Sequence, residues 1–200
     1  WSLGLIVVPG KARGLIRKKL KTTGLKTSDT ASLIFKECKV SKENLLGVPG
    51  KGFYYLLKSL QRERLVCAVA LNALALNIIN ETIQFLKDRK RFGEPLSKKQ
   101  VIRHRIVELK TSVEASRQFA YAVCHVFAKN NPADEEIIML KTLSYETCEK
   151  VIRECAHLHG AESFLTNHRL SHVYQDSQAF TLAAGTSEIM KDLLAGMIGM

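Results

Sequence analysis

The feature that most constrains the fold is an uninterrupted stretch from Lys51 to Lys90. It contains no proline, and no glycine follows Gly52 within it. Its apolar residues recur at close to helical spacing: Leu56, Leu57, Leu60, Val66, Val69, Ala70, Ala73, Leu74, Leu76 and Ile78. The spacing predicts one helix of roughly ten turns. A helix this long needs partners of similar length along its apolar face, so we expect a mainly α-helical protein.

One polar cluster, Gln61-Arg62-Glu63-Arg64, interrupts the apolar part of this stretch shortly after its start. Charged residues on a helix are most often a solvated face, and that is the simpler interpretation of this cluster. The alternative is that Glu63 and Arg64 carry chemistry, and the residues elsewhere in the chain decide between the two.

The remainder of the sequence also has a helical pattern, broken at Phe92–Pro95. Helices are expected at about Lys98–Lys129 with Ser97 as cap, from an Asp134 cap to about His159, over Asn167–Tyr174, and after Gly185 with Thr186 or Ser187 as cap. Gly160 suits a helix C-terminus. Three long helices and a fourth, joined by short loops, predict an antiparallel four-helix bundle over residues 51–200.

The first fifty residues have the pattern of β-structure instead. We expect a buried strand at Leu3–Val8, a second at Leu15–Leu20, and short strands at Ser32–Phe35 and Cys38–Val40. So few strands cannot close a barrel or cover their own edges. The sheet of residues 1–50 therefore either packs against the helices or is the remnant of a larger β domain, and residues 51–200 form a separate helical domain.

Charge and composition exclude several classes of protein. The net charge is +11, with basic residues concentrated in Lys11–Lys26 and Lys87–Arg105. No exposed aromatic residues alternate with them and no nucleic-acid-binding module is recognisable, which argues against nucleic acid. A polyphosphate ligand such as coenzyme A or a dinucleotide requires the same sign of charge.

The cysteine pattern and the first ten residues bear on the cellular compartment of the protein. There are five cysteines and no CxxC pair, which favours a reducing compartment and argues against a disulfide framework or a metal site. The first ten residues lack the basic segment and cleavage site of a signal peptide, and no apolar run reaches the ~18 residues expected of a transmembrane helix.

Three motifs follow the helix that carries RERL. The first is DRKRFGEPLSKKQ, with Arg89, Phe92 and Gln100; the second is HLHGAESF at 157–164; the third is AGTSEIMKDLLAG at 184–196. In this order, and after LKTTGLKTSDTASLIFKECKV and GKGFYYLLKSLQRERL, they resemble the C-terminal part of the acyl-CoA dehydrogenases. The resemblance extends over essentially all 200 residues and is strongest to the long-chain and isovaleryl types.

The resemblance implies flavin-dependent α,β-dehydrogenation of an acyl-CoA thioester in fatty-acid β-oxidation. Many family members carry the catalytic base directly before the Gly-Thr of the last motif, where this sequence has Ala184. In the long-chain and isovaleryl types the base lies on the long helix, at the position of Glu63. The resemblance thus implies Glu63 as the α-proton base and Arg64 as a substrate-binding residue.

The resemblance also implies FAD as cofactor. Arg89, Phe92 and Gln100 match the motif that reaches the FAD of a neighbouring subunit, and an arginine suits a pyrophosphate. Thr186 and Glu188 match flavin-contacting positions at a helix start. The remaining two, His159 and Gly160, match the Gly-Gly turn beside the adenine.

Several residues depart from the family pattern between 157 and 183. His157 replaces a glutamine, Ala161 and Ser163 replace glycines, Asn167, Arg169 and Gln175 replace a glutamate, a proline and an arginine, and Ala183 replaces a tyrosine. A methyl group where the family has glycine hinders close approach of the backbone to a ligand. These changes bear on cofactor affinity more than on fold.

Family members begin with a helical domain and a complete β-barrel domain, and the resemblance implies that residues 1–50 are only the C-terminal part of that β domain. The sequence is therefore interpreted as a fragment, an incomplete gene model or a truncated relative. The family implies a homotetramer built as a dimer of dimers, reoxidation by an electron-transfer flavoprotein, and the mitochondrial matrix. The alternatives are an acyl-CoA oxidase, or a non-catalytic helical module that oligomerises.

Overall fold

The computed structural model describes residues 3–200, which divide into two compact units, the first ending at Arg62 and the second beginning at Glu63. Helix α1, Gly52–Asp88, begins in the first unit and ends in the second. It has the length predicted from the proline-free stretch. The prediction of a mainly α-helical protein with small strand segments at the N-terminus is confirmed.

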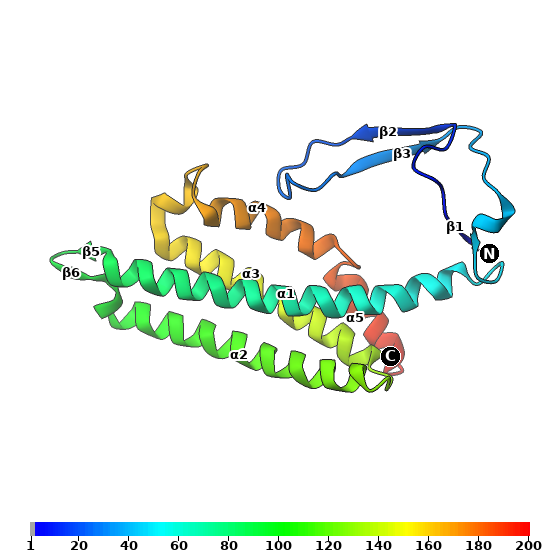
Figure 1. Ribbon diagram of the computed structural model, residues 1–200. Helices are drawn as coiled ribbons and strands as arrows, with labels where there is room; N and C mark the ends of the chain where they lie inside the picture. Colours follow the sequence, from blue (N-terminus) through cyan, green and yellow to red (C-terminus); the bar gives the residue numbers. More distant parts are fainter. Residues whose placement is uncertain (1–2) are drawn as a thin grey trace. The chain divides into compact units, whose positions relative to one another are not determined.

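The first unit holds two small antiparallel sheets. Strand β1 (Leu5–Ile6) pairs with β4 (Leu45–Leu46), and β2 (Leu15–Lys19) pairs with β3 (Ala31–Phe35) in the register Ile16 to Ile34. A 3₁₀ turn, η1, spans Lys42–Asn44. The strands expected at Leu15–Leu20 and Ser32–Phe35 are present as β2 and β3, and Figure 1 shows the hairpin that they form in blue.

Two predictions for this unit were wrong. The buried strand at Leu3–Val8 is only the two-residue β1, and Ile6 and Val7 are about half exposed. Cys38–Val40 forms no strand. In both places the sequence is apolar enough for a strand, but a strand also needs a neighbour to complete its hydrogen bonds.

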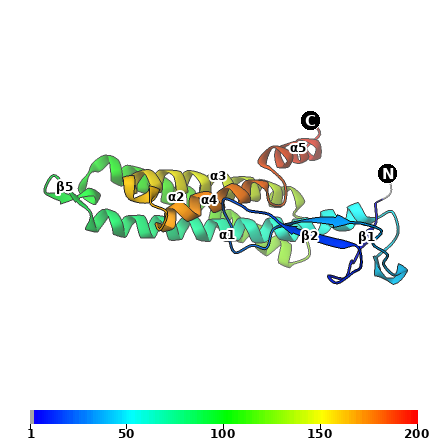
Figure 2. The same cartoon turned by 90° about the horizontal axis from the view of Figure 1, so that it is seen from above.

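The second unit is an up-and-down helical bundle (Figure 1). After α1, the elements are β5 (Lys90–Arg91), β6 (Glu94–Pro95), η2 (Leu96–Lys98), α2 (Gln100–Ala128), α3 (Asp134–His159), η3 (Gly160–Phe164), α4 (Arg169–Leu182) and α5 (Ser187–Met197). Helix α3 packs against α2, α4 and α5, and Figure 2 shows α4 lying along α3 from a second direction. The predicted antiparallel bundle is therefore present.

Three local predictions about helix ends were wrong. Ser97 lies in η2 and does not cap α2, which begins after Lys99 without a side-chain cap. Asp134 is the first residue of α3, not its cap, so its carboxylate contributes to the acidic first turn instead. Helix α4 extends to Leu182, well beyond the predicted end at Tyr174.

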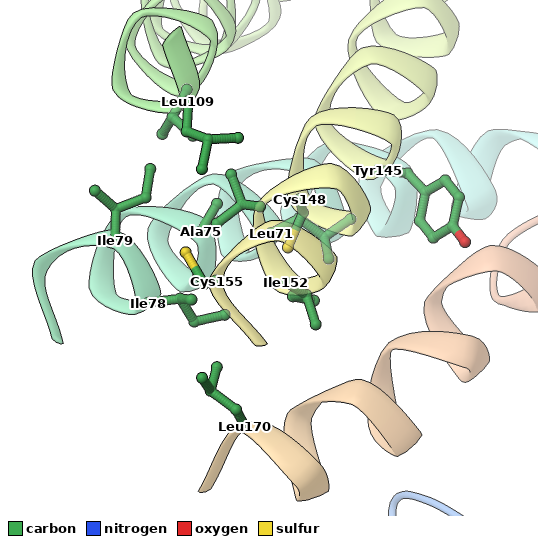
Figure 3. Packing of buried hydrophobic residues seen from close by; sticks show 12 residues of the cluster. Leu71, Ala75, Ile78, Ile79, Leu109, Tyr145, Cys148, Ile152, Cys155 and Leu170 are labelled. Atoms are coloured by element: carbon green, nitrogen blue, oxygen red, sulfur yellow. The ribbon is translucent and has the colours of Figure 1, made fainter. Parts of the chain in front are cut away.

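The bundle core consists of two clusters of buried side chains. In Figure 3, residues of α1, α2, α3 and α4 meet at one centre: Leu71, Ala75, Ile78, Ile79, Leu109, Val113, Tyr145, Cys148, Val151, Ile152, Cys155 and Leu170. A second cluster comprises Leu65, Ala68, Ala120, Val123, Ala133, Ile137 and Leu140. The buried Cys148 and Cys155 are free thiols whose burial raises their pKa to about 12 and about 11, as suits small core residues.

A short polar chain crosses the core between the two clusters. The amide of Asn72 on α1 donates to Ser144 Oγ on α3 at 2.9 Å, and Ser144 Oγ lies 3.2 Å from Ser116 Oγ on α2. All three residues are buried. Burying polar groups of this kind costs free energy unless they are paired, so these hydrogen bonds fix the relative register of the three helices.

By length and composition alone, α1 also satisfies the test for a helix that could cross a membrane, with a mean hydropathy of 1.6 over its most apolar window. Core helices of soluble proteins satisfy the same test, and 39% of that window is buried here. The side chains that α1 buries, Leu71 and Ile78 among them, are those of the bundle core.

Candidate functional site

The two residues predicted to act on the substrate are neighbours on α1 with different surroundings. Arg64 is buried, with 4% of its surface exposed, whereas Glu63 is exposed. Successive residues of a helix point about 100° apart, so one turn of α1 directs Arg64 into the bundle and leaves Glu63 accessible.

The loop between α4 and α5 has an unusual backbone. Ala184 has φ of +58° and Gly185 has φ of +107°. A non-glycine residue in the left-handed region is strained, and such strain persists only where surrounding contacts hold it in place. Gly185 is suited to its position because a residue with a Cβ rarely adopts that backbone.

Two buried cations hold this loop from two helices. The Nε of Arg64 on α1 donates to the carbonyl oxygen of Ala184 at 3.0 Å, and the Nζ of Lys141 on α3 donates to the carbonyl oxygen of Gly185. Lys141 is completely buried. The backbone strain of the turn is thus balanced by charge-assisted hydrogen bonds to consecutive carbonyl groups.

Burial dominates the electrostatics of this cluster. It lowers the pKa of Arg64, while the negative charges of Asp134 and Glu63 act in the opposite direction. Burial also lowers the pKa of Lys141, an effect that Cys67 and Glu188 oppose and Arg64 reinforces. Removal of a cation from water disfavours its charged form, so both groups depend on the oxygen atoms they bind.

Helix α5 begins directly after the loop. The hydroxyl of Thr186 accepts a hydrogen bond from the backbone N–H of Ile189 at 3.3 Å, so the predicted cap is confirmed. Hydrogen bonds from its own backbone N–H and from Thr186 lower the pKa of Glu188. Ser187 is buried, and within residues 3–200 its hydroxyl has no hydrogen-bond partner. The start of α5 therefore holds one buried polar group that no described residue satisfies.

The DRKRFG motif forms a tight hairpin at the far end of α1. Strands β5 and β6 pair around Phe92 and Gly93, which have φ of +52° and +84°. Positive φ at both loop residues is the signature of a type I′ turn, and glycine at the second position is typical of it. The phenyl ring of Phe92 is 98% exposed. Gln100 is the first residue of α2 and is also exposed.

The HLHGAESF motif lies beside this hairpin. Arg89 Nη1 makes an ion pair with Glu162 Oε1 of η3 at 3.1 Å. Gly160, with φ of +64°, ends α3 as predicted. Ser163, one of the departures from the family pattern, donates to the carbonyl oxygens of Ala156 and Gly160, each at 2.8 Å. Its hydroxyl therefore provides a hydrogen-bond donor to two carbonyl groups at the C-terminal end of α3.

His159 of that motif packs against α1. Its ring stacks on Phe85 at 4.0 Å between centroids, and its Nε2 lies 3.3 Å from the hydroxyl of Thr82. Burial, and then the neighbouring His168, lower its pKa. Its Nδ1 is buried without a partner among the described residues. The imidazole is thus held neutral with one nitrogen unsatisfied.

The predicted site residues form two groups. Glu63, Arg64, Thr186 and Glu188 belong to the part of the bundle around the α4–α5 loop, whereas Arg89, Phe92, Gln100, His159 and Gly160 lie at the other end of the bundle. Roughly 40 Å of helix separates Glu63 from Arg89 at the α-helical rise per residue. The structure does not bring these groups together within one chain.

Lys141 was not among the site residues predicted from the sequence. A signal for it exists, because helical spacing puts position 141 on the same face as Ile137, Ser144 and Cys148. A lysine on an apolar face is seldom fully buried unless a partner binds it. The partner, a backbone carbonyl 44 residues away, cannot be identified from spacing.

Comparisons with known proteins agree with the motifs. The family model described as acyl-CoA dehydrogenase, C-terminal domain, matches residues 50–198. Mouse long-chain specific acyl-CoA dehydrogenase, mitochondrial, is 32% identical over 198 residues, 98% of this chain and 46% of that protein. The caffeyl-CoA reductase-Etf complex subunit CarC of Acetobacterium woodii is 29% identical over 94% of this chain and 49% of that protein.

Solved structures give the same result. An acyl-CoA dehydrogenase from Geobacillus kaustophilus superimposes with a TM-score of 0.96 at 34% identity, covering 98% of this chain and 52% of that one. An acyl-CoA dehydrogenase complexed with FAD from Bacillus anthracis shares the fold, with a TM-score of 0.92 at 22% identity over 96% of this chain and 36% of that one.

The chain spans about half the length of the curated relatives it matches. Within that half, the match is continuous and includes the long helix, the RFG hairpin and the GTSE turn. The chain belongs to the acyl-CoA dehydrogenase family.

Proposed function

We propose that this chain supplies the helical part of a flavin-dependent active site that dehydrogenates an acyl-CoA thioester at its α and β carbons. Membership of the acyl-CoA dehydrogenase family supports this class of reaction. In the proposal, Glu63 is the α-proton base and Arg64 is a substrate-side residue.

One observation carries the assignment of Glu63. Ala184 stands where many family members have the base, and its carbonyl oxygen accepts a hydrogen bond from Arg64, the residue next to Glu63. Glu63 is therefore the sequence neighbour of the residue that contacts the position from which the base is missing. This adjacency supports a base that has moved from the α4–α5 loop to α1.

The chemistry required of Glu63 is proton abstraction next to a thioester carbonyl. Its carboxylate would form an O–H bond as the Cα–H bond breaks, and the electron pair left on Cα would form the new double bond. The glutamate is exposed in this chain, so it is accessible to a substrate. Arg64 would fix the position of the loop opposite the base through Ala184.

The residues present fit FAD at both ends. The unpartnered Ser187 hydroxyl adjoins Thr186 and Glu188 at the start of α5, and the unpartnered His159 Nδ1 adjoins Gly160 at the end of α3. When bound, FAD would accept the hydride that leaves the β carbon. Arg89 and Gln100 would donate hydrogen bonds to its pyrophosphate or adenine end.

The separation of the two groups supports an oligomer. An extended FAD molecule is shorter than the roughly 40 Å of helix between Glu63 and Arg89, so one molecule cannot contact both groups of a single chain. Each site would then combine the Glu63 end of one chain with the Phe92 hairpin of a neighbour. A homotetramer built as a dimer of dimers provides such pairs.

The electron acceptor and the compartment are further parts of the proposal. We propose an electron-transfer flavoprotein as the acceptor, in line with the Acetobacterium woodii relative whose name includes an Etf complex. The mitochondrial matrix is proposed from the mouse relative, which is named as mitochondrial. The bacterial relatives lie outside that compartment, so direct imaging of the tagged protein in cells is the test of location.

The function is tested with the full-length protein loaded with FAD. Glu63→Gln is expected to lower α-proton exchange into deuterated water by about a thousandfold, while the amount of bound flavin is unchanged. Glu108→Gln, the same change at an exposed position of α2, is the matched control and should have no effect. Undiminished exchange in Glu63→Gln would contradict the assignment.

Two further measurements separate the alternatives. Adding Ala184→Glu to Glu63→Gln should restore part of the exchange, because the two positions adjoin through Arg64. Rapid oxygen consumption with acyl-CoA would indicate an oxidase instead of a dehydrogenase. Absence of bound flavin under all loading conditions would indicate the non-catalytic module.

A further inference from the structure

The turn at Ala184–Gly185 is held by contacts from outside its own segment. Both residues have positive φ, and their carbonyl groups point to cations on two different helices. Arg64 binds the first carbonyl from α1 and Lys141 binds the second from α3. A strained turn persists only where such contacts determine it, so the two cations set its conformation.

Lys141 is the more unusual of the two. It is completely buried on α3. Ile137 and Leu140, in the same part of α3, belong to the second hydrophobic cluster of the core. Removal of an ammonium group from water is costly, and a methionine would occupy similar space without that cost. What the lysine adds is a charged donor to Gly185 O.

The carbonyl that Lys141 binds is that of the residue directly before Thr186. Thr186 caps α5 through the Ile189 N–H, and its own carbonyl accepts from the Met190 N–H at 2.9 Å. The position of Gly185 therefore determines where α5 begins and where the side chains of Thr186 and Glu188 lie.

We propose that Lys141 is a positioning residue for the flavin-contacting residues Thr186 and Glu188, acting through its hydrogen bond to the Gly185 carbonyl. The inference rests on the proposed function, since that function gives Thr186 and Glu188 their ligand. Lys141 itself touches neither substrate nor cofactor in this scheme. It ties the start of α5 to α3, as Arg64 ties the preceding residue to α1.

The structure provides a matched control on the same pair of helices. Lys191 on α5 makes an ion pair with Glu146 on α3 at 2.8 Å, on the exposed side of the α3–α5 contact. Lys191→Met removes a lysine and an α3–α5 contact but leaves both loop carbonyls bound. Lys141→Met removes the donor to Gly185.

Two readouts on the full-length protein test the proposal. In the FAD titration, Lys141→Met is expected to weaken binding by about tenfold, the scale of a lost hydrogen bond to a charged group. In amide hydrogen exchange without FAD, the Ile189 and Met190 amides should exchange faster, while the α2 core amides keep their protection. Lys191→Met should change neither readout.

The outcomes separate the two ideas. If Lys141→Met matches Lys191→Met in both readouts, the positioning role is overturned. If exchange at Ile189 and Met190 quickens but the wild-type protein binds no FAD, the proposed function is overturned and Lys141 remains only an anchor of the turn.

A second variant covers the case in which Lys141→Met does not fold. Lys141→Gln retains a neutral and shorter N–H donor at the same position, so it should change both readouts in the same direction by a smaller factor. Wild-type FAD affinity together with wild-type exchange in Lys141→Gln would overturn the proposal.

Discussion

The guanidinium Nε of Arg64 donates a hydrogen bond to the carbonyl oxygen of Ala184 at 3.0 Å across 120 residues of sequence. This bond joins the long helix to the strained turn that precedes α5. In the proposed function, it also places the residue beside Glu63 against the position at which the family resemblance locates the base of many members. The relationship between these two residues gives the site its geometry.

Arg64→Met is expected to destabilise the bundle. The change leaves the Ala184 carbonyl without its donor in a partly buried place, and such a loss costs about 1–3 kcal/mol of unfolding free energy. Urea unfolding followed by circular dichroism measures it. Arg62→Met, at an exposed position on the same turn of α1, should stay within about 0.5 kcal/mol of the wild type. Equal stabilities of the two variants would contradict this role for Arg64.

Thr186→Ala should weaken the start of α5. The Thr186 hydroxyl accepts from the Ile189 N–H, and the loss of such a cap typically costs about 1 kcal/mol. Thr186→Ser keeps a hydroxyl at the cap and should retain most of the stability. The measurement is thermal unfolding of the two variants, together with their FAD affinity. An alanine variant as stable as the serine variant would show that the cap contributes little.

Phe92→Asn is expected to have opposite effects on stability and on cofactor binding. Asparagine tolerates the left-handed backbone better than phenylalanine, so relief of strain in the β5–β6 turn should stabilise the single chain by roughly 1 kcal/mol. Little packing is lost, because the ring is 98% exposed. If the hairpin reaches a neighbour's FAD, the same variant should bind FAD more weakly. Calorimetry and FAD titration in parallel test both effects.

The pH dependence of stability should change at His159. Burial lowers the pKa of its imidazole below the ordinary 6.5, so the unfolded chain takes up a proton at a higher pH than the folded one. The contribution of His159 is therefore intact above pH 6.5 and is lost as the pH falls below 6.5 toward the lowered pKa. The groups around the ring are His168, Glu162 and Glu81.

His159→Phe tests this dependence directly. A phenyl ring can stack on Phe85 as the imidazole does, but it does not titrate. The fall in melting temperature on acidification below pH 6.5 should be shallower in this variant than in the wild type. His157→Phe, exposed on the same helix end, should retain the wild-type slope. A variant with an unchanged slope would place the acid sensitivity elsewhere.

Much of the fold could be predicted because the signals are local. The proline-free stretch gave α1 within two residues of its observed end, and Gly160 and Thr186 marked helix ends at the correct positions. The strand errors at Leu3–Val8 and Cys38–Val40 arose because strand formation depends on a partner segment. Helix α4 was predicted too short because its polar residues weaken the periodic signal, whereas its packing against α3 extends it.

For the candidate site, the sequence by itself determined the motifs, the family and the absence of a carboxylate at Ala184. Only the tertiary structure decided that Arg64 and Lys141 bind the consecutive carbonyls of Ala184 and Gly185. It also decided that Arg89, directly after the end of α1, forms an ion pair with Glu162 of η3. The physical reason is that motifs reflect local backbone requirements, whereas a buried cation and its carbonyl partner are brought together only when distant helices pack.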